Sequence, residues 1–290
     1  KVHLGGGNDT VSGSSLNDTV FGQAGDDSIV TNNGNDWISG GAGDDTLNAG
    51  GGIDVLNFSE VSGAVTVDLD AGTVANDGQG GTDTISGFEN VLGGTGNDNI
   101  TGSAAAETIA GGAGNDTLNG GDGTDTVFFG FAANNMIINM ATGVVTGEGT
   151  DQISNFEIVV AGLANDSIIG TTGNDWVWGN DGDDTFVSGS GEDTLYGGSG
   201  NDTFVLTDDE FNDSVFGGEG FDTLDLSAIT RDLNENIYDS SAYLGSLLDD
   251  ANGKTDRIIN GQLNSDYLTD SIDDRYEDIE AVIAGGGNDK

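Results

Sequence analysis

The sequence contains no cysteine and no proline, and it has only 6 Lys and Arg residues against 51 Asp and Glu in 290 residues. Without cysteine there is no disulfide framework and no thiolate zinc site. The formal net charge of −45 excludes nucleic acids and anionic membranes as natural partners, because like charges repel. The composition therefore favours cations as partners.

Long apolar runs and catalytic combinations are missing as well. No apolar run approaches the roughly 18 residues of a membrane-spanning helix, and the N-terminus shows no signal-peptide pattern. His3 is the single histidine, so Ser–His–Asp and Cys–His catalysis is not available and we expect no enzyme activity. Because both ends of the sequence lie inside repeats, we expect the chain to be a piece of a longer polypeptide.

Glycine is abundant, with 52 residues, and it accompanies a strict nine-residue period. Acidic residues recur nine positions apart, and a large apolar residue follows each of them by two positions. A fixed period indicates a repeat architecture and argues against a disordered acidic linker. The acidic positions are Asp9, Asp18, Asp27, Asp36, Asp45 and Asp54; Glu89, Asp98, Glu107, Asp116 and Asp125; Glu157, Asp166, Asp175, Asp184, Asp193 and Asp202; Asp213 and Asp222; and Glu280 and Asp289.

The repeat unit reads G-G-x-G-[ND]-D-x-U-x, where U is a large apolar residue. Its clearest copies are GGAGDDTLN (40–48), GGAGNDTLN (111–119) and GGSGNDTFV (197–205). This unit resembles the RTX (repeats-in-toxin, haemolysin-type) calcium-binding nonapeptide. The resemblance implies an all-β fold, a parallel β-roll (a solenoid) with two nonapeptides per turn, and calcium ions between stacked loops.

The chemistry of the unit agrees with this resemblance. The x-U-x tail, rich in Thr, Val, Ile and Phe, suits a very short strand in which only U points inward. Glycine supplies positive φ and leaves carbonyl groups free to approach an ion. Ca²⁺ takes six to eight oxygens from carboxylates and carbonyls. One inward side chain in nine buries little apolar surface, so we expect the fold to depend on calcium.

We predict that the register aspartates bind multiple calcium ions, with alternate loops on the same side of the roll. The predicted ligands are Asp9, Asp18, Asp27, Asp36, Asp45, Asp54, Asp98, Asp116, Asp125, Asp166, Asp175, Asp184, Asp193, Asp202, Asp213, Asp222 and Asp289. Three of the register glutamates, Glu89, Glu157 and Glu280, are expected to mark array ends. Glu107 lies in a loop without its glycines, where we expect a lost or weakened site, so Asp98 should be the better partner of Asp116 than Glu107 is of Asp125.

Breaks in the phase divide the chain into arrays and inserts. We expect repeat arrays at 1–57, 87–128 and 155–225, β-hairpin inserts at 58–86 and 129–154, and the start of a further array at 280–290. The remaining insert, 226–279, contains four of the six basic residues and a helix-like apolar spacing. It is interpreted either as an insert that pairs with the acidic roll or as a contact surface. Asp68 and Asp70 of the first hairpin are expected to be solvated.

Several functions remain open. The first is a non-enzymatic calcium-binding module of a large secreted or cell-surface bacterial protein of the adhesin, surface-layer or toxin type; the resemblance implies type I secretion and folding outside the cell. The second is the C-terminal module of a secreted protease, lipase or alginate-modifying enzyme, and the third is an ice-binding face. Besides calcium, the partners considered are further copies of the chain and a cell-surface or polysaccharide ligand, with no nucleic acid and no membrane insertion.

Overall fold

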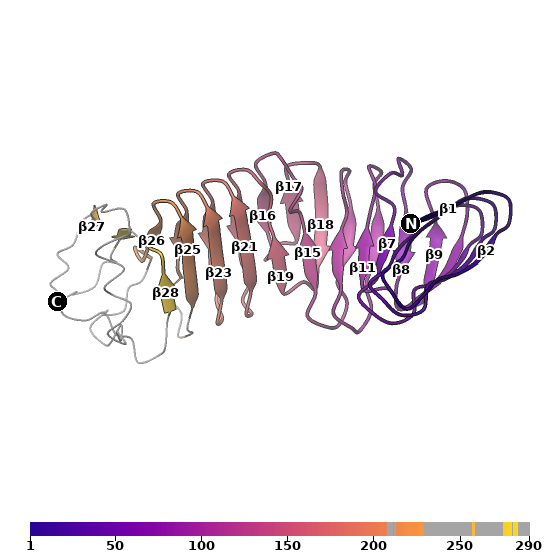
Figure 1. Cartoon of the computed structure of the whole chain (residues 1–290). Coiled ribbons are helices and arrows are strands. Elements are labelled where there is room, and N and C mark those ends of the chain that lie inside the picture. The colour runs from indigo at the N-terminus through magenta and orange to yellow at the C-terminus, as the bar shows by residue number, and fades with distance from the viewer. Residues whose placement is uncertain (208–210, 212, 229–256, 259–274, 280, 284–290) are drawn as a thin grey trace. The chain divides into compact units, whose positions relative to one another are not determined.

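The computed structural model describes residues 1–207, 211, 213–228, 257–258, 275–279 and 281–283. The chain forms two compact units: unit 1 comprises Lys1–Phe129 and Gly143–Ile158, and unit 2 comprises Gly130–Thr142 and Val159–Lys290. The described residues form strands and turns (Figure 1). None of them belongs to a helix with the length and apolarity that crossing a bilayer requires.

Unit 1 is built from short strands, most of them three residues long, as expected for an x-U-x tail. They are β1 (Val2–Gly6), β2 (Thr10–Ser12), β3 (Thr19–Ala24), β4 (Ser28–Val30), β5 (Trp37–Ala42), β6 (Thr46–Asn48), β7 (Val55–Asn57), β8 (Thr66–Asp68), β9 (Thr73–Asn76), β10 (Asp83–Ser86), β11 (Asn90–Leu92), β12 (Asn99–Thr101), β13 (Thr108–Ala110), β14 (Thr117–Asn119), β15 (Thr126–Phe128), β17 (Val144–Thr146) and β18 (Thr150–Ser154).

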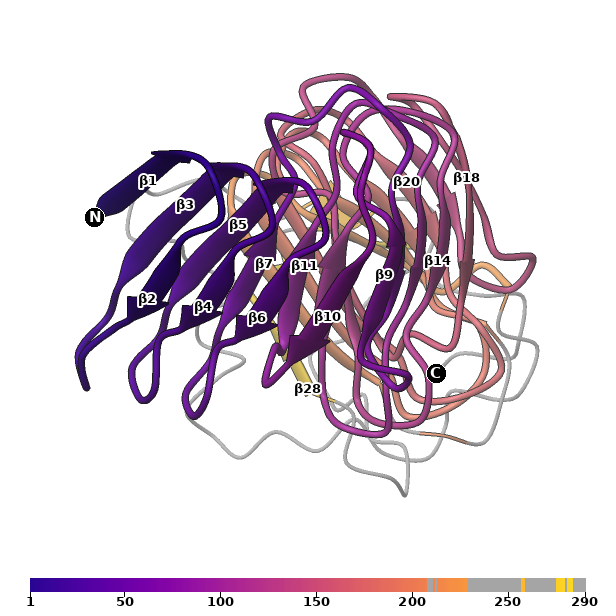
Figure 2. The ribbon, with the colours of Figure 1, turned by 90° about the vertical axis from the view of Figure 1, so that its right-hand side faces the viewer.

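Successive strands of unit 1 alternate between two sheets, so two nonapeptides make one turn. One sheet has the order β1-β3-β5-β7-β11-β13-β15, and in the other β2, β4, β6 and β10 pair in parallel. Partners in the arrays are 18 residues apart, as for Val20 and Ile38. Figure 2 shows β1, β3 and β5 stacked beside β2, β4 and β6.

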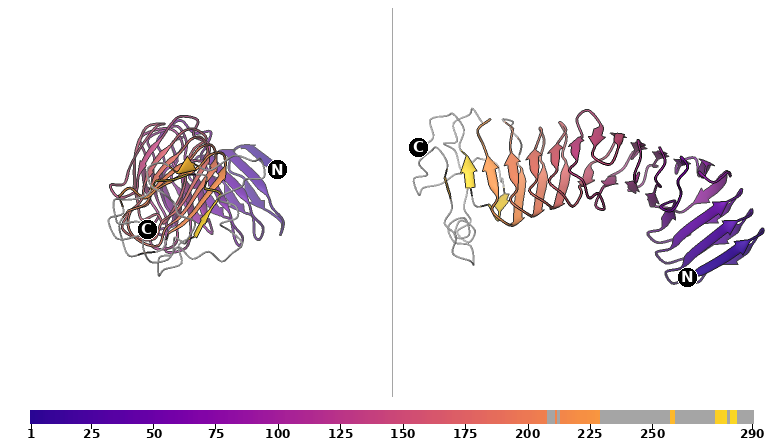
Figure 3. Two further views of the ribbon diagram at one scale, coloured as in Figure 1. Left: turned by 90° about the vertical axis from the view of Figure 1, so that its left-hand side faces the viewer. Right: turned by 90° about the horizontal axis from the view of Figure 1, so that it is seen from above.

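Unit 2 repeats this arrangement with parallel strands. Its strands are β16 (Ile137–Asn139), β19 (Ile158–Val160, of which the first residue belongs to unit 1), β20 (Ser167–Ile169), β21 (Trp176–Asp181), β22 (Thr185–Val187), β23 (Thr194–Ser199), β24 (Thr203–Val205), β25 (Ser214–Glu219), β26 (Thr223–Asp225), β27 (Arg257–Ile258), β28 (Arg275–Glu277) and β29 (Ala281–Ile283). One sheet runs β21-β23-β25-β28, and the other runs β16-β20-β22-β24-β26-β29. Figure 3 shows these successive rungs from above.

The core of each unit is a ladder of the residues at the U position. Ile38 and Leu47 of unit 1 and Phe186 and Phe204 of unit 2 are almost fully buried, and the two phenylalanine rings stack with centroids 4.7 Å apart. Their strand neighbours are partly or fully exposed. The predicted all-β parallel roll, with one inward side chain per nonapeptide, is confirmed.

The inserts contribute strands to these same sheets. In unit 1, β9 pairs antiparallel with β8 and β10, and β17 pairs antiparallel with β18. The outer strands of these hairpins continue the parallel stacks, because β10 pairs with β6 and β18 with β14. Most of the 226–279 insert, including its basic residues Arg231 and Lys254, lies outside the described residues, as do Glu280 and Asp289.

Candidate metal centre

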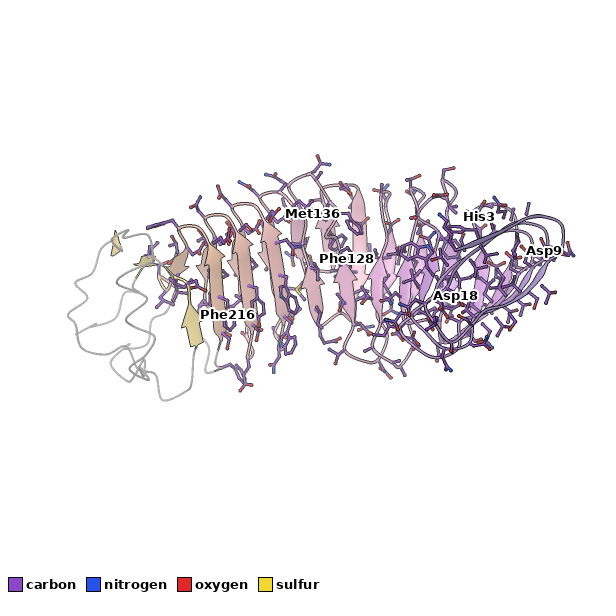
Figure 4. The ribbon with its side chains drawn as sticks, in the orientation of Figure 1. His3, Asp9, Asp18, Phe128, Met136 and Phe216 are labelled. Atoms are coloured by element: carbon purple, nitrogen blue, oxygen red, sulfur yellow. The ribbon has the colours of Figure 1, made fainter. Side chains whose placement is uncertain are left out.

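The register aspartates form hydrogen-bonded ladders along the roll. In most array loops the backbone N–H of the aspartate donates to Oδ1 of the aspartate in the following turn, for example from Asp27 to Asp45 at 2.8 Å and from Asp184 to Asp202 at 2.8 Å. The carbonyl group of Asp27 in turn accepts the N–H of Thr46. This bonding uses only one oxygen of each carboxylate and fixes the direction of the other. Figure 4 labels Asp9 and Asp18, which belong to two different ladders of unit 1.

In one class of loop the second carboxylate oxygen, Oδ2, is buried and accepts no hydrogen bond from the described residues. We call these loops open loops. Their aspartates are Asp9, Asp27, Asp36, Asp45, Asp54, Asp116, Asp184 and Asp202.

Open loops share a backbone conformation four residues before the aspartate. That residue has positive φ, and its N–H makes no hydrogen bond to Oδ2 of the aspartate. It is glycine in some loops, such as Gly41 and Gly198, but Gln23, Asn32 and Asn180 adopt the same conformation. The conformation therefore belongs to the stacked loop itself and does not require glycine.

Glycine five residues before the aspartate has a different function. A Cβ at Gly40, Gly179 or Gly197 would collide with Oδ2 of the aspartate in its own loop. At Gly179 the same point lies 2.6 Å from the carbonyl oxygen of Gly197 in the next turn. The missing side chain thus leaves a space on which a carboxylate oxygen and a carbonyl oxygen converge.

In a second class of loop the carboxylate is satisfied internally, and we call these closed loops. The N–H of Gly94 donates to Oδ2 of Asp98 at 2.8 Å, and the N–H of Gly162 does so for Asp166 at 2.8 Å. Elsewhere a hydroxyl joins the N–H as a donor, as Thr171 does for Asp175. The closed loops are those of Asp18 with Ser14, Asp98 with Gly94, Glu107 with Ser103, Asp166 with Gly162, and Asp175 with Thr171.

The electrostatics of the ladders are those of carboxylates without counter-charges. Burial raises the pKa of Asp184 to about 8, and the like charges of Asp202 and Asp166 add to this rise. Burial and the neighbouring charges of Asp45 and Asp77 likewise raise the pKa of Asp83 to about 7. Residues 2–230 contain no lysine or arginine. These residues therefore supply no lysine or arginine counter-charge, and protons or a bound cation can neutralise the carboxylates instead.

These loops fit calcium by the chemistry of their donors. Calcium is a hard cation that takes carboxylate and carbonyl oxygens in a flexible geometry, and both kinds of oxygen converge on the space beside Gly179. Within the described residues, no group of three or more Asp, Glu or His side chains is placed to hold an ion by itself. An ion bound there would therefore need main-chain carbonyls to complete its coordination shell, and the glycine-rich loops leave room for them.

Glutamates and insert aspartates end the ladders. Oε2 of Glu89 accepts the N–H of Asp54, and Oε2 of Glu157 accepts the N–H of Asp125, both at 2.9 Å. Glu89 and Glu157 thus end two of the ladders, and their assignment to array ends stays a prediction. On the other side of the roll, Oδ1 of Asp83 accepts the N–H of Asp45, and Oδ1 of Asp151 accepts that of Asp116.

The structure places the predicted ligands that it describes in these ladders. The loops of Asp98 and Glu107 are both closed, and the expected advantage of Asp98 over Glu107 as a calcium ligand stays a prediction. Asp213 and Asp222 keep the register although their partners are 20 residues away, and Asp289 lies outside the described residues. The ligand role of the register aspartates stays a prediction.

Sequence reasoning missed two sets of residues. Asp83 and Asp151 come from the inserts, and their hairpin strands concealed the register they share with the repeat aspartates. An Asn or Asp directly before many of the register aspartates forms a second, exposed ladder: Oδ1 of Asn17 accepts the N–H of Asn35, whose own Oδ1 accepts the N–H of Ile53. The Asn or Asp at the fifth position of the motif is the signal for this ladder.

The fold and the loops together define a parallel β-roll with repeated calcium-type oxygen sites. The family model of the RTX calcium-binding nonapeptide repeat (4 copies) matches residues 3–36, 21–56, 101–135, 160–195, 179–210 and 207–228, more than half of the chain. The chain belongs to the family of RTX calcium-binding nonapeptide repeats.

Two further comparisons add little to this assignment. The chain matches no curated protein. Among solved structures it is similar to the X-ray crystal structure of a hyperactive, Ca²⁺-dependent, beta-helical antifreeze protein from an Antarctic bacterium, with 22% identity over 79% of this chain and 86% of that chain and a TM-score of 0.27.

Proposed function

We propose that this chain is a calcium-loaded structural module of a larger secreted or cell-surface bacterial protein, and that it folds when it meets calcium outside the cell. The observation that carries the proposal is the set of open loops. Each holds a buried carboxylate oxygen that accepts no hydrogen bond from the described residues, in a region without lysine or arginine. Multiple calcium ions, held by the register aspartates and loop carbonyls, supply the missing charge.

The energetics connect this binding to folding. Buried carboxylates without partners oppose the folded state, and the single inward side chain of each nonapeptide buries little apolar surface. A ligand that binds only the folded chain stabilises it by an amount that grows with ligand concentration. Extracellular calcium modules have dissociation constants of about 10⁻⁴–10⁻³ M, so the chain stays unfolded at cytosolic calcium and folds outside. An adhesin, surface-layer or toxin protein is the type of parent protein that this behaviour suits.

A calcium titration of the chain tests the proposal. We expect circular dichroism to show an unfolded chain in excess chelator and a cooperative gain of strand signal as calcium rises to millimolar concentrations. Magnesium at the same concentration is the control, because it demands near-octahedral geometry and gives up its waters reluctantly. A strand spectrum in excess chelator equal to the calcium-loaded one at neutral pH would contradict the proposal.

A further inference from the structure

The turn that closes the first hairpin insert contains a buried carboxylate outside the nine-residue register. Asp77 follows β9 and is fully buried, although it lies in a glycine-rich turn. Its Oδ1 accepts three backbone N–H groups, from Gln79 at 2.7 Å, Gly80 at 2.6 Å and Gly81 at 2.9 Å. These bonds fix the carboxylate and hold the turn around it.

The second oxygen of Asp77 is unsatisfied. Among the described residues no group donates to Oδ2, which is buried. It faces the same side of Gly81 as a main-chain oxygen of the neighbouring loop: a Cβ at Gly81 would lie 2.8 Å from Oδ2 of Asp77 and would collide with the carbonyl oxygen of Gly43. A carboxylate oxygen and a carbonyl oxygen therefore converge there, as they do beside the glycines of the open loops.

A second carboxylate belongs to the same turn. Asp83 begins β10 and is also buried, and its Oδ2 accepts no hydrogen bond within the described structure. Its Oδ1 accepts the N–H of Asp45, which ties the turn to the last open loop of that ladder. Thr82 adds a tie to the same loop by donating its N–H and hydroxyl to Oδ1 of Asp44.

We propose that this turn is an additional calcium site, in which Asp77, outside the repeat register, binds the ion through Oδ2 together with Asp83 and the carbonyl oxygen of Gly43. The site deepens the proposed function, since it adds an ion where the array meets an insert. It terminates the ladder of Asp9, Asp27 and Asp45 with a cation, where a further repeat loop is missing.

The second hairpin insert provides an internal comparison. Asp83 pairs with Val74 and Asp151 with Val145, so the two turns are equivalent. Residues 75–82 connect the first pair, whereas only residues 146–150 connect the second. The shorter turn has Glu148 at its exposed tip and no aspartate at an inward position. The additional site is therefore expected in the first insert only.

The experiment compares two single variants with the full chain in saturating calcium. Asp77→Asn keeps an oxygen for the three N–H groups and replaces Oδ2 by an amide. Asp70→Asn removes the same charge from an exposed position of the same hairpin. We expect native mass spectrometry to count one calcium ion fewer in Asp77→Asn than in the wild type and Asp70→Asn. Equal counts in all three proteins would overturn the additional site and leave the repeat sites standing.

A measurement on the wild type covers the case in which Asp77→Asn does not fold. In crystals grown with calcium, an anomalous difference map should show a peak at about 2.3–2.6 Å from Oδ2 of Asp77. Peaks at the open loops without one at Asp77 would overturn this inference alone. A wild type that takes up no calcium would overturn the proposed function and this site with it.

Discussion

Open and closed loops share one register and one ladder of N–H to Oδ1 bonds, and they differ in the fate of Oδ2. In the open loop of Asp184 this oxygen accepts no hydrogen bond from the described residues, whereas in the closed loop of Asp98 it accepts the N–H of Gly94. Nearly the same sequence thus produces either an oxygen free for a cation or a carboxylate satisfied by its own loop.

Position in the array accounts for four of the five closed loops; the fifth is that of Asp18, although the loop of Asp9 before it is open. Asp98 and Glu107 are the first loops after one insert, and Asp166 and Asp175 are the first after the other. In the preceding rung, the N–H of Val65 donates to Oδ1 of Asp98, and the N–H of Met136 donates to Oδ1 of Asp166. The closed loop stabilises its carboxylate without an ion and so caps the array.

The test with the largest expected effect replaces one aspartate from an open loop and one from a closed loop by asparagine. Asp184→Asn keeps the Oδ1 ladder but removes a ligand oxygen, so the chain should lose one ion and about 3 kcal/mol of stability when calcium is a hundredfold above its Kd. Asp98→Asn loses the bond from Gly94, about 1–3 kcal/mol, and should keep every ion. Urea unfolding in saturating calcium and native mass spectrometry measure both. Equal ion loss in the two variants would remove the distinction.

The open loops should also make calcium-free folding depend on pH. Because burial raises the pKa of Asp184 to about 8 and that of Asp83 to about 7, the folded chain binds protons that the unfolded chain releases near pH 4. In chelator, stability from these groups is fully present below about pH 4 and is lost as the pH rises through 7 and 8.

Circular dichroism in chelator between pH 4 and 9 measures this dependence. Strand signal should be greatest at the acid end. The calcium midpoint at pH 5.5 should be at least about tenfold higher than at pH 8, because protons compete with the ion for the same oxygens. Asp184→Asn should flatten the dependence between pH 7 and 9. A chelated chain that is equally unfolded at every pH would contradict the role given to these protons.

Thr171→Gly tests whether a closed loop can be opened. The substitution removes the hydroxyl that donates to Asp175 and allows the positive φ that accompanies open loops. The following turn already has positive φ at Gly189. Because the closed loops of Asp98 and Asp166 already have glycine at this position, we expect native mass spectrometry to count no additional calcium ion, with exposed Thr172→Gly as the control. One additional ion would mean that the residue, and not position in the array, closes the loop.

The nine-residue period was sufficient to predict the short strands and the inward U residue, because each is a local property repeated along the chain. The parallel stacking was predicted from the resemblance to the RTX repeat. The period could not predict which loops are open and which are closed. Gly94 and Gly112 occupy the same place in their repeats, yet only Gly112 has positive φ, because the deciding contact comes from the rung before. Asp77 was also missed, since its burial depends on how a hairpin turn packs against a loop more than 30 residues earlier.

The smallest expected effect concerns the exposed ladder beside the open loops. Asn35 links two turns, since its N–H donates to Asn17 and its Oδ1 accepts the N–H of Ile53 at 3.1 Å. Asn35→Ala removes one exposed hydrogen bond, so it should cost about 0.5–1 kcal/mol and leave the ion count unchanged, although the neighbouring loop of Asp36 is open. Urea unfolding in saturating calcium measures the loss, with exposed Asn33→Ala as the control. Loss of an ion in Asn35→Ala alone would show that the exposed ladder is part of the calcium site and does more than hold successive turns in register.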